Sequence, residues 1–315
     1  MQRVVQAAKM YYQLDYSQQQ IAKELGISRP SVSRLLQEAK DTGIVQIKIN
    51  DISQQEQELA IKIRKKYGLK ECIIVNVPQN NGLIIKRYLG EKSAEYLANS
   101  IKDGDVIATT WGTTIYEVAK NLVSKQVQQV DVVQMNGGIS HSETNTFAAE
   151  ILNYLGSSLQ TTPYFLPLPA IVERAEIRQM IMSDRHILSV LELAKEANIA
   201  IFTVGDRHED STLTKAGYLN ETDLNKLEEN QAVGDICSRF INKAGEICNE
   251  ELNDRTIGID VHNLRNKETS ILIAGGSRKF NSIVGALNGA YANVLITDQF
   301  TARELVKNQR HEKGR

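Results

Sequence analysis

From Cys72 onward the chain carries six short, continuous apolar runs, each bounded by polar or glycine-rich turns. The runs are CIIVNV, DVIATT, VDVVQM, IAIFTV, ILIA and NVLIT. Because they are continuously apolar rather than alternating, they predict strands that are buried on both faces. The helical patterns between them indicate parallel crossovers. The sequence therefore predicts an α/β fold with a doubly wound parallel sheet, which binds ligands at the carboxyl ends of its strands.

Size and composition place the chain among soluble globular proteins. Its 315 residues suffice for a sizeable core and favour two domains over one. No apolar run approaches the length that crosses a bilayer, and the N-terminal MQRVVQAAKMYY lacks the apolar core of a signal peptide. We therefore expect a cytoplasmic protein with no membrane partner.

The number and spacing of the cysteines argue against a zinc site and against a disulfide framework. Cys72, Cys237 and Cys248 are too widely spread for a zinc ribbon, and their odd number does not support a disulfide framework. We expect reduced, structural thiols and no metal site.

The segment from Gln18 to Gln37, QQQIAKELGISRPSVSRLLQ, has the pattern of two short helices around a turn. Gly26 can take the left-handed conformation that ends the first helix, and Ser28 can cap the second. Pro30 falls in the first turn of the second helix, where its missing N–H costs little. Apolar residues keep helical spacing on both sides of the turn: Ile21, Ala22 and Leu25 before it, and Val32, Leu35, Leu36 and Ala39 after it. These features predict a helix-turn-helix.

If the apolar residues of the second helix face inward, a set of polar donors lies at its start and on its outer face. They are Ser28, Arg29, Ser31, Ser33, Arg34 and Gln37. Arginine can bind guanine and glutamine can bind adenine through paired hydrogen bonds, and serine hydroxyls can bind phosphates or base edges. The alternative is an amphipathic hairpin with a solvated polar face. The turn glycine, the serine cap and the apolar positions, all in register, favour DNA binding.

Charge permits this interpretation without deciding it. Residues 1–50 contain seven Lys/Arg against four Asp/Glu, whereas the whole chain has a net charge of −1. The surplus at one end is compatible with DNA, and the overall balance argues against a uniformly basic coat.

The residues that follow predict a wing and a connector. Residues 43–49, GIVQIKI, alternate at period two as a short half-buried strand would, which fits a winged helix-turn-helix. Residues 51–66 are polar, glutamine-rich and compatible with a connecting helix. We expect a DNA-binding domain over residues 1–52 and an α/β domain over residues 53–315.

Three of the predicted strands are followed by loops suited to a small anion. Residues 111–114, WGTT, offer free backbone N–H groups and two hydroxyls, and residues 136–138, NGG, let a ligand approach the backbone. Residues 275–279, GGSRK, add a cation and a hydroxyl at a helix start. Each loop alone could be a tight turn, but three of them favour one crevice. None matches the dinucleotide or P-loop spacing, so we expect no nucleotide cofactor.

Several segments resemble the SorC family of bacterial sugar-responsive regulators. They are YYQLDYSQQQIAKELGISRPSVSRLLQEAKDTGIVQIKI at the N-terminus, then DGDVIATTWGTT, the NGG loop, AVGDICSRFINKAG, NDRTIGI and AGGSRKFNSIVGALNGAYANVLITDQFTA. The resemblance covers essentially the whole chain and is strongest to the deoxyribonucleoside regulators of that family. It implies a winged helix-turn-helix joined to a Rossmann-like effector-binding and oligomerisation domain of the sugar-phosphate isomerase type, assembled as a homodimer or homotetramer.

The resemblance also implies a set of effector-binding positions. They are Gly112, Thr113 and Thr114 in the first loop, Asn136, Gly137 and Gly138 in the second, Lys279 in the third, and Asn145 and Asp254 elsewhere. Deoxyribonucleoside regulators can place a lysine where Asn136 stands. A lysine amine can condense with an aldehyde sugar but an amide cannot, so we expect reversible hydrogen bonding here.

Together these features predict a regulator, specifically a repressor of a deoxyribonucleoside or sugar catabolic operon. Its expected partners are operator DNA and a phosphorylated sugar such as deoxyribose 5-phosphate. The alternative is a phosphosugar isomerase-like enzyme with an accessory DNA-binding domain. Against it, Ser140-His141-Ser142 lacks an orienting carboxylate, and His186 has the context of a surface helix residue. A DNA-packaging protein is disfavoured by the large, acidic-leaning α/β domain.

Overall fold

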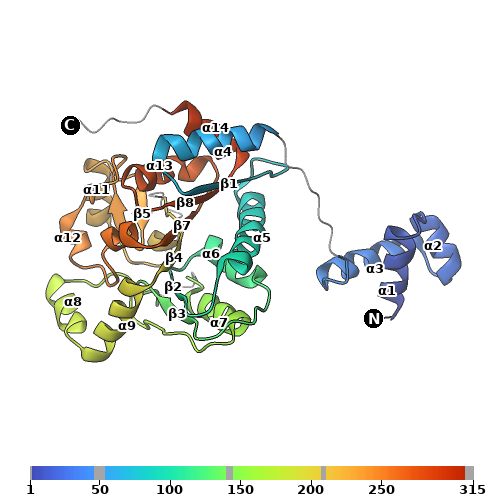
Figure 1. Cartoon of the computed structure of the whole chain (residues 1–315), viewed down its shortest axis with the longest axis horizontal. Coiled ribbons are helices and arrows are strands. Elements are labelled where there is room, and N and C mark those ends of the chain that lie inside the picture. The colour runs from blue at the N-terminus through green and yellow to red at the C-terminus, as the bar shows by residue number, and fades with distance from the viewer. Residues whose placement is uncertain (1, 46–53, 140–144, 207–210, 309–315) are drawn as a thin grey trace. The chain divides into compact units, whose positions relative to one another are not determined.

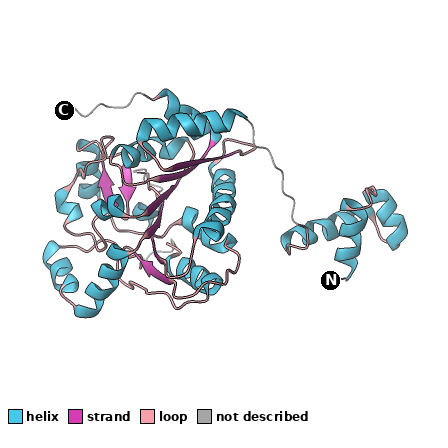
Figure 2. Cartoon of the chain, in the orientation of Figure 1, coloured by secondary structure: helices cyan, strands magenta, loops and turns pink. Residues whose placement is uncertain are grey.

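The computed structural model describes residues 2–45, 54–139, 145–206 and 211–308. The chain divides into two compact units, residues 1–52 and 53–315 (Figure 1). The described part of the first unit contains helices, and that of the second contains a sheet with helices (Figure 2). No helix among these residues is long and apolar enough to cross a membrane.

The first unit is built from three helices, α1 (Gln2–Tyr12), α2 (Gln18–Leu25) and α3 (Arg29–Asp41). Ser17 and Gln20 form a capping box at the start of α2, and Gly26 ends that helix with a φ of 62°. The Ser28 side chain accepts the backbone N–H of Ser31 and so begins α3. The helices pack through a small apolar core that includes Ala7, Ile21, Val32 and Leu36.

This arrangement confirms the predicted helix-turn-helix. The predicted wing stays a prediction. Most of the strand expected over residues 43–49 falls on residues 46–53, which lie outside the described residues. The expected connecting helix is present as α4 (Gln54–Tyr67).

The second unit contains a six-stranded parallel sheet in the order β1-β8-β7-β4-β2-β3. Its strands are β1 (Glu71–Val75), β2 (Val106–Thr109), β3 (Asp131–Gln134), β4 (Ile199–Phe202), β7 (Thr269–Ile273) and β8 (Val294–Asp298). Each coincides with one of the six apolar runs, so the prediction of a buried parallel sheet is confirmed.

Helices cover both faces of this sheet. The remaining helices are α5 (Gly82–Ser100), α6 (Thr113–Asn121), α7 (Ala148–Leu159), α8 (Ala175–Met182), α9 (Arg185–Glu196), α10 (Thr212–Lys215), α11 (Glu221–Glu229), α12 (Glu250–Asn253), α13 (Phe280–Asn288) and α14 (Gln299–Lys307), with 3-10 turns η1 (Val261–Asn266) and η2 (Ser277–Lys279). One apolar core lies between the sheet and α5, α6 and α7, and a second between the sheet and α4, α9, α13 and α14 (Figure 1). Strand β4 shows the division: Ile199 and Ile201 belong to the first core, Ala200 and Phe202 to the second.

The strand order reverses at β2, and this reversal positions the ligand crevice. From β2 the chain moves outward to β3, and it then returns to place β4 on the other side of β2. The connections after β2 and β4 therefore diverge, which opens a crevice at the carboxyl ends of these neighbouring strands.

One element has no counterpart in the sequence-based prediction. Strands β5 (Gly234–Ile236) and β6 (Arg239–Ile241) form an antiparallel hairpin outside the main sheet. Its two turn residues, Cys237 and Ser238, have φ values of 51° and 67°. Such values fit the tight turn of a two-residue hairpin, although glycine or asparagine is the usual choice there.

Candidate functional site

The polar surface of α3 has the exposure that base readout requires. Arg29, Ser33, Arg34 and Gln37 are exposed, while Val32, Leu36 and Ala39 of the same helix are buried. Gln37 Nε2 donates to Asp41 Oδ1 at 2.8 Å, which orients the amide along the helix.

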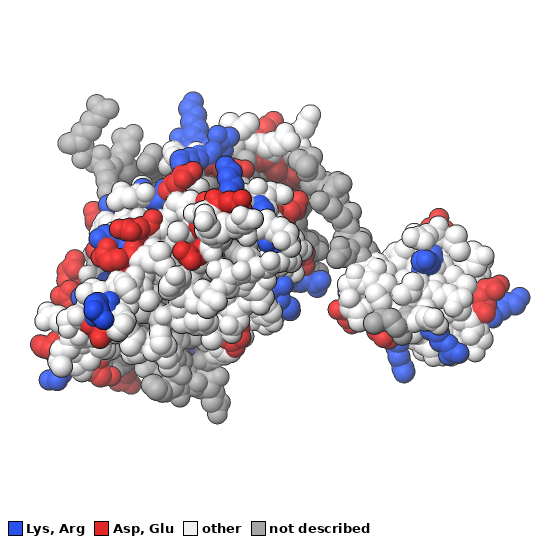
Figure 3. Space-filling view, turned by 60° about the horizontal axis from the view of Figure 1, so that its bottom comes forward, with Lys and Arg blue, Asp and Glu red and all other residues white. Residues whose placement is uncertain are grey.

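Ser28 and Ser31 form hydrogen bonds that cap the start of α3. Their hydroxyl oxygens lie 2.8 Å apart, and Ser28 Oγ accepts the backbone N–H of Ser31. Figure 3 shows both basic and acidic side chains on the visible surface of the first unit, which fits a small basic surplus rather than a uniformly basic coat.

A cavity of about 510 Å³ lies at the carboxyl ends of the central strands of the second unit. Its lining comes from the segments that follow β2, β3, β4 and β7, from the β5–β6 hairpin and from the start of α5. These segments contribute residues 80–83 and Lys86, 110–114, Asn136, 203–206, 211–213, 235, 237–238 and 275–279. The volume suits a small metabolite.

The first loop presents an open helix terminus to the cavity. Gly112 precedes α6 with a φ of 120°, a backbone conformation that a residue with a Cβ rarely adopts. No side chain caps α6, so the N–H groups of its first turn keep their capacity to bind an anion. Thr113 and Thr114 add hydroxyls to the same wall.

Lys279 extends the polar surface from the third loop. Its Nζ donates to Thr203 Oγ1 at 3.4 Å, and both residues line the cavity. Burial lowers the pKa of the Lys279 amine to about 8, and the nearby Asp206 carboxylate opposes that shift. Arg278 lies beside it and pairs with Asp206 at 3.4 Å.

Asn136 is fully buried against the cavity wall, where its side-chain amide is held in place. Thr110 Oγ1 donates to Asn136 Oδ1 at 2.9 Å, and Asn136 Nδ2 donates to Ser238 Oγ at 3.1 Å. The amide therefore links the end of β2 to the turn of the β5–β6 hairpin.

The two glycines after Asn136 do not line the cavity. A Cβ at Gly137 would lie 2.1 Å from the carbonyl oxygen of Pro169, and a Cβ at Gly138 would lie 2.7 Å from Trp111 Cδ1. Neighbouring protein atoms, rather than a ligand, therefore occupy the space that the missing side chains leave.

Asn145 and Asp254 also lie outside the lining of this cavity. Asn145 is exposed; its Oδ1 accepts the backbone N–H of Phe147 and its Nδ2 donates to Glu150, so it organises the start of α7. Asp254 is exposed at the end of α12. Of the nine effector-binding candidates, the cavity thus brings together Gly112, Thr113, Thr114, Asn136 and Lys279.

Lys86 and Asp235 line the cavity but were not among the sequence-based candidates. Lys86 Nζ donates to Thr113 Oγ1 at 3.2 Å. Burial raises the pKa of the Asp235 carboxyl group to about 6, while the backbone N–H of Ser238 and the Lys279 ammonium stabilise its charged form. A sequence signal existed for Asp235 alone, since it lies in the AVGDICSRF segment that carries the family resemblance.

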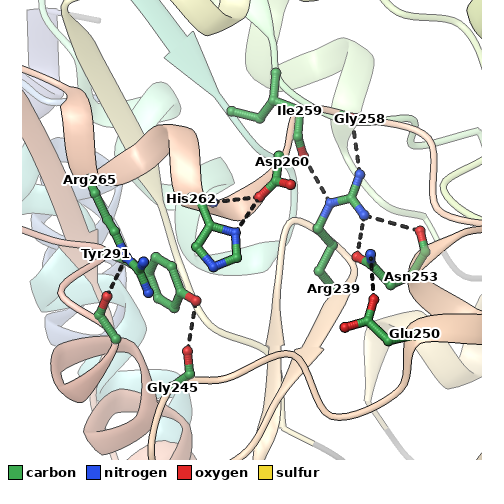
Figure 4. A network of polar contacts seen from close by, with 11 residues as sticks. Arg239, Gly245, Glu250, Asn253, Gly258, Ile259, Asp260, His262, Arg265 and Tyr291 are labelled. Atoms are coloured by element: carbon green, nitrogen blue, oxygen red, sulfur yellow. Dashed lines mark hydrogen bonds and ion pairs between the residues drawn. The ribbon is translucent and has the colours of Figure 1, made fainter.

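A buried arginine fixes the hairpin that carries Asp235. Arg239 is 3% exposed, and its guanidinium donates to the carbonyl oxygens of Ile259, Asn253 and Gly258 at 2.9, 3.1 and 3.1 Å (Figure 4). Gly258 in turn forms a β-bridge with Asn136. Arg239 therefore ties the hairpin to the segment that backs the cavity wall, and the NDRTIGI stretch serves this wall rather than contacting the cavity.

The structure describes one of the two histidines that were considered as catalytic groups. His186 is exposed in the first turn of α9 and is absent from the cavity lining. His141 and its neighbours Ser140 and Ser142 lie outside the described residues.

Comparison with known proteins decides the family. A family model described as "Putative sugar-binding domain" matches residues 52–307, and a Crp-like helix-turn-helix model matches residues 2–59. The chain is 50% identical over 304 residues to the deoxyribonucleoside regulator of Bacillus subtilis, which covers 96% of this chain and 97% of that protein. It is 30% identical over 309 residues to the sorbitol operon regulator of Klebsiella pneumoniae, with coverage of 96% and 97%.

The chain belongs to the SorC family of transcriptional regulators. The crystal structure of the full-length Klebsiella pneumoniae sorbitol operon regulator SorC matches this SorC-family chain with a TM-score of 0.73 at 28% identity, over 96% of this chain and 98% of that one. This SorC-family protein is accordingly a DNA-binding transcriptional regulator with a helix-turn-helix and a sugar-binding domain. Its named relatives are regulators rather than enzymes.

Proposed function

We propose that this regulator represses a deoxyribonucleoside or sugar catabolic operon in the cytoplasm and releases its operator when a phosphorylated sugar binds. The observation that carries the proposal is the cavity, which combines the uncapped start of α6, two threonine hydroxyls and the Lys279 ammonium with a carboxylate at Asp235. Oriented N–H groups and cations suit a phosphate, and carboxylate and amide groups suit sugar hydroxyls.

The relative with 50% identity supports deoxyribose 5-phosphate as the first effector to test, because that relative is named for deoxyribonucleosides. Asn136 has no amine, so capture through an imine at this position is not part of the proposal. Hydrogen bonds would hold the sugar reversibly.

For operator binding we propose that Arg29, Ser33, Arg34 and Gln37 read the major groove while Ser28 and Ser31 position the start of α3. One chain carries a single such helix, and helix-turn-helix proteins read two half-sites through symmetric pairing. A homodimer or homotetramer with a palindromic or repeated operator follows from this. Effector binding must then favour one state of the assembly through a difference in affinity.

The experiment is an operator titration with the full chain. Fluorescence anisotropy of DNA from upstream of the regulated genes measures affinity, first without effector and then with millimolar deoxyribose 5-phosphate, ribose 5-phosphate or deoxyribose. We expect the phosphorylated deoxy sugar to release the DNA. The proposal would be refuted if no sugar phosphate changed the affinity for the operator, or if the chain bound any duplex equally well at moderate salt.

A second candidate, turnover of a phosphosugar, is favoured only by the proximity of Asp235 to Lys279, with pKa values of about 6 and 8. Such a pair could exchange protons near neutral pH. Incubation of the chain with pentose phosphates, followed by product analysis, tests it directly. Product formation at a useful rate would show that the chain catalyses a reaction and does not merely bind the sugar.

A further inference from the structure

The charged residues in the cavity leave a positive surplus after their internal pairing. Its lining includes the cations Lys86, Arg278 and Lys279 and the carboxylates Asp206 and Asp235. Arg278 and Asp206 form an ion pair with each other. Among the lining residues that the structure describes, two ammonium groups then remain against the single carboxylate of Asp235, an arrangement that suits an anionic ligand.

Lys86 contributes one of these two positive charges. It comes from helix α5 and not from the three strand-end loops. It lies in the second turn of α5, and its Nζ reaches Thr113 Oγ1 at 3.2 Å, directly over the first residue of α6. Within the part of the chain that the structure describes, Lys86 forms no ion pair. Its hydrogen-bond partner is a neutral hydroxyl, which leaves the ammonium charge uncompensated.

The packing of α5 on α6 fixes this position. Gly90 lies one turn beyond Lys86, and Glu117 lies one turn beyond Thr113. A Cβ at Gly90 would be 2.5 Å from the Cβ of Glu117, so the two helices approach there as closely as a glycine permits. One turn earlier the same crossing brings Lys86 onto the start of α6. The location of the amine is therefore set by the helix pair rather than by a mobile loop.

We propose that Lys86 is the residue that makes the cavity select a phosphorylated sugar over the same sugar without phosphate. This inference rests on the proposed function and adds an orientation to it. The phosphate lies against Lys86, Thr113 and the N–H groups at the start of α6, and the sugar hydroxyls point toward Asp235. An ammonium, a hydroxyl and a helix N-terminus each favour a phosphate oxygen, and together they neutralise most of a dianion.

The test compares four full-length proteins: the parent chain, Lys86→Gln, Lys86→Arg and Arg87→Gln. Arg87 is the matched control, because it carries the same charge one residue along α5 but its side chain is 73% exposed, pairs with Glu91 and does not line the cavity. Affinities for deoxyribose 5-phosphate and for deoxyribose are measured through the fluorescence of Trp111, the single tryptophan, which lines the cavity.

We expect the parent chain to bind the phosphorylated sugar more tightly. Lys86→Gln should weaken binding of deoxyribose 5-phosphate at least about tenfold while it changes binding of deoxyribose less than about twofold. Lys86→Arg should restore most of the affinity, and Arg87→Gln should change neither.

An undiminished preference for the phosphate in Lys86→Gln would overturn the assignment. So would an equal loss for both ligands, since that pattern indicates a structural role for Lys86. If the parent chain itself binds the two sugars equally, the failure lies in the proposed phosphorylated effector, and the assignment of Lys86 falls with it.

Discussion

Asp235→Asn should stabilise the folded chain at neutral pH and weaken its binding of effector. Burial raises the pKa of Asp235 from 3.8 to about 6, so the charged carboxylate is less stable in the folded cavity than in the unfolded chain. A raised pKa of a carboxyl group means that the folded state binds the proton more tightly. The destabilisation is therefore complete above about pH 7, declines as the pH falls through 6, and disappears only below the unfolded-state pKa of 3.8.

The magnitude follows from the two pKa values. A difference of about 2 units corresponds to about 3 kcal/mol when the group is fully charged in both states. Asp235 is partly exposed, and its loss removes a favourable neighbour of Lys279, so we expect a net gain of about 1–3 kcal/mol at pH 7.5. At pH 5 about half of the gain should remain, and at pH 4 about a fifth.

Urea unfolding monitored through Trp111 measures this effect, because that residue is 8% exposed in the folded chain. Glu173→Gln, on an exposed loop, removes a surface carboxylate as the control and should change stability by less than about 0.5 kcal/mol. The reasoning is refuted if Asp235→Asn is no more stable than the parent chain at pH 7.5, or if its advantage stays constant down to pH 4.

Three further outcomes follow from the geometry. Gly90→Ala should destabilise the chain by about 1–3 kcal/mol in urea, because the new methyl group collides with Glu117; unchanged stability would show that α5 and α6 can separate. Arg34→Ala should weaken specific operator binding by about 1–3 kcal/mol in the anisotropy titration and relax sequence preference at one position, whereas an unchanged footprint would remove Arg34 from base readout. Lys279→Gln should abolish release of the operator by sugar phosphate while effector-free operator affinity stays the same, and retained release would exclude Lys279 from the effector site.

Much of the architecture was predictable because its signals are local. A strand buried on both faces must be continuously apolar, and each of the six runs became a strand of the sheet. The start of α3 was equally readable, since a serine followed by a proline and an apolar periodic run matches the requirements of a helix N-terminus. The strand-end loops followed from the topology rule for parallel sheets.

The composition of the cavity was less predictable, because it depends on which distant segments meet. Lys86 precedes Thr113 by 27 residues, and only the close crossing at Gly90 brings the two together. The β5–β6 hairpin escaped prediction because its turn contains cysteine and serine where asparagine and glycine are the usual signal.

The glycine pair at Gly137 and Gly138 shows a further limit. A missing side chain in the sequence says that something approaches the backbone closely, but it does not say what. In this fold the approaching groups are Pro169 and Trp111, so the pair permits close packing of the protein beside the cavity and does not line it.

The thiol of Cys237 gives the hairpin turn a built-in reporter. Cys237 is 3% exposed at the cavity wall, and burial raises the pKa of its thiol to about 12. The sulfur is therefore both inaccessible and protonated, and it should react slowly with alkylating reagents. Modification then requires the turn to lift away from the wall. The rate at which a maleimide labels Cys237 would therefore report how often the turn opens, and a ligand in the cavity should lower that rate.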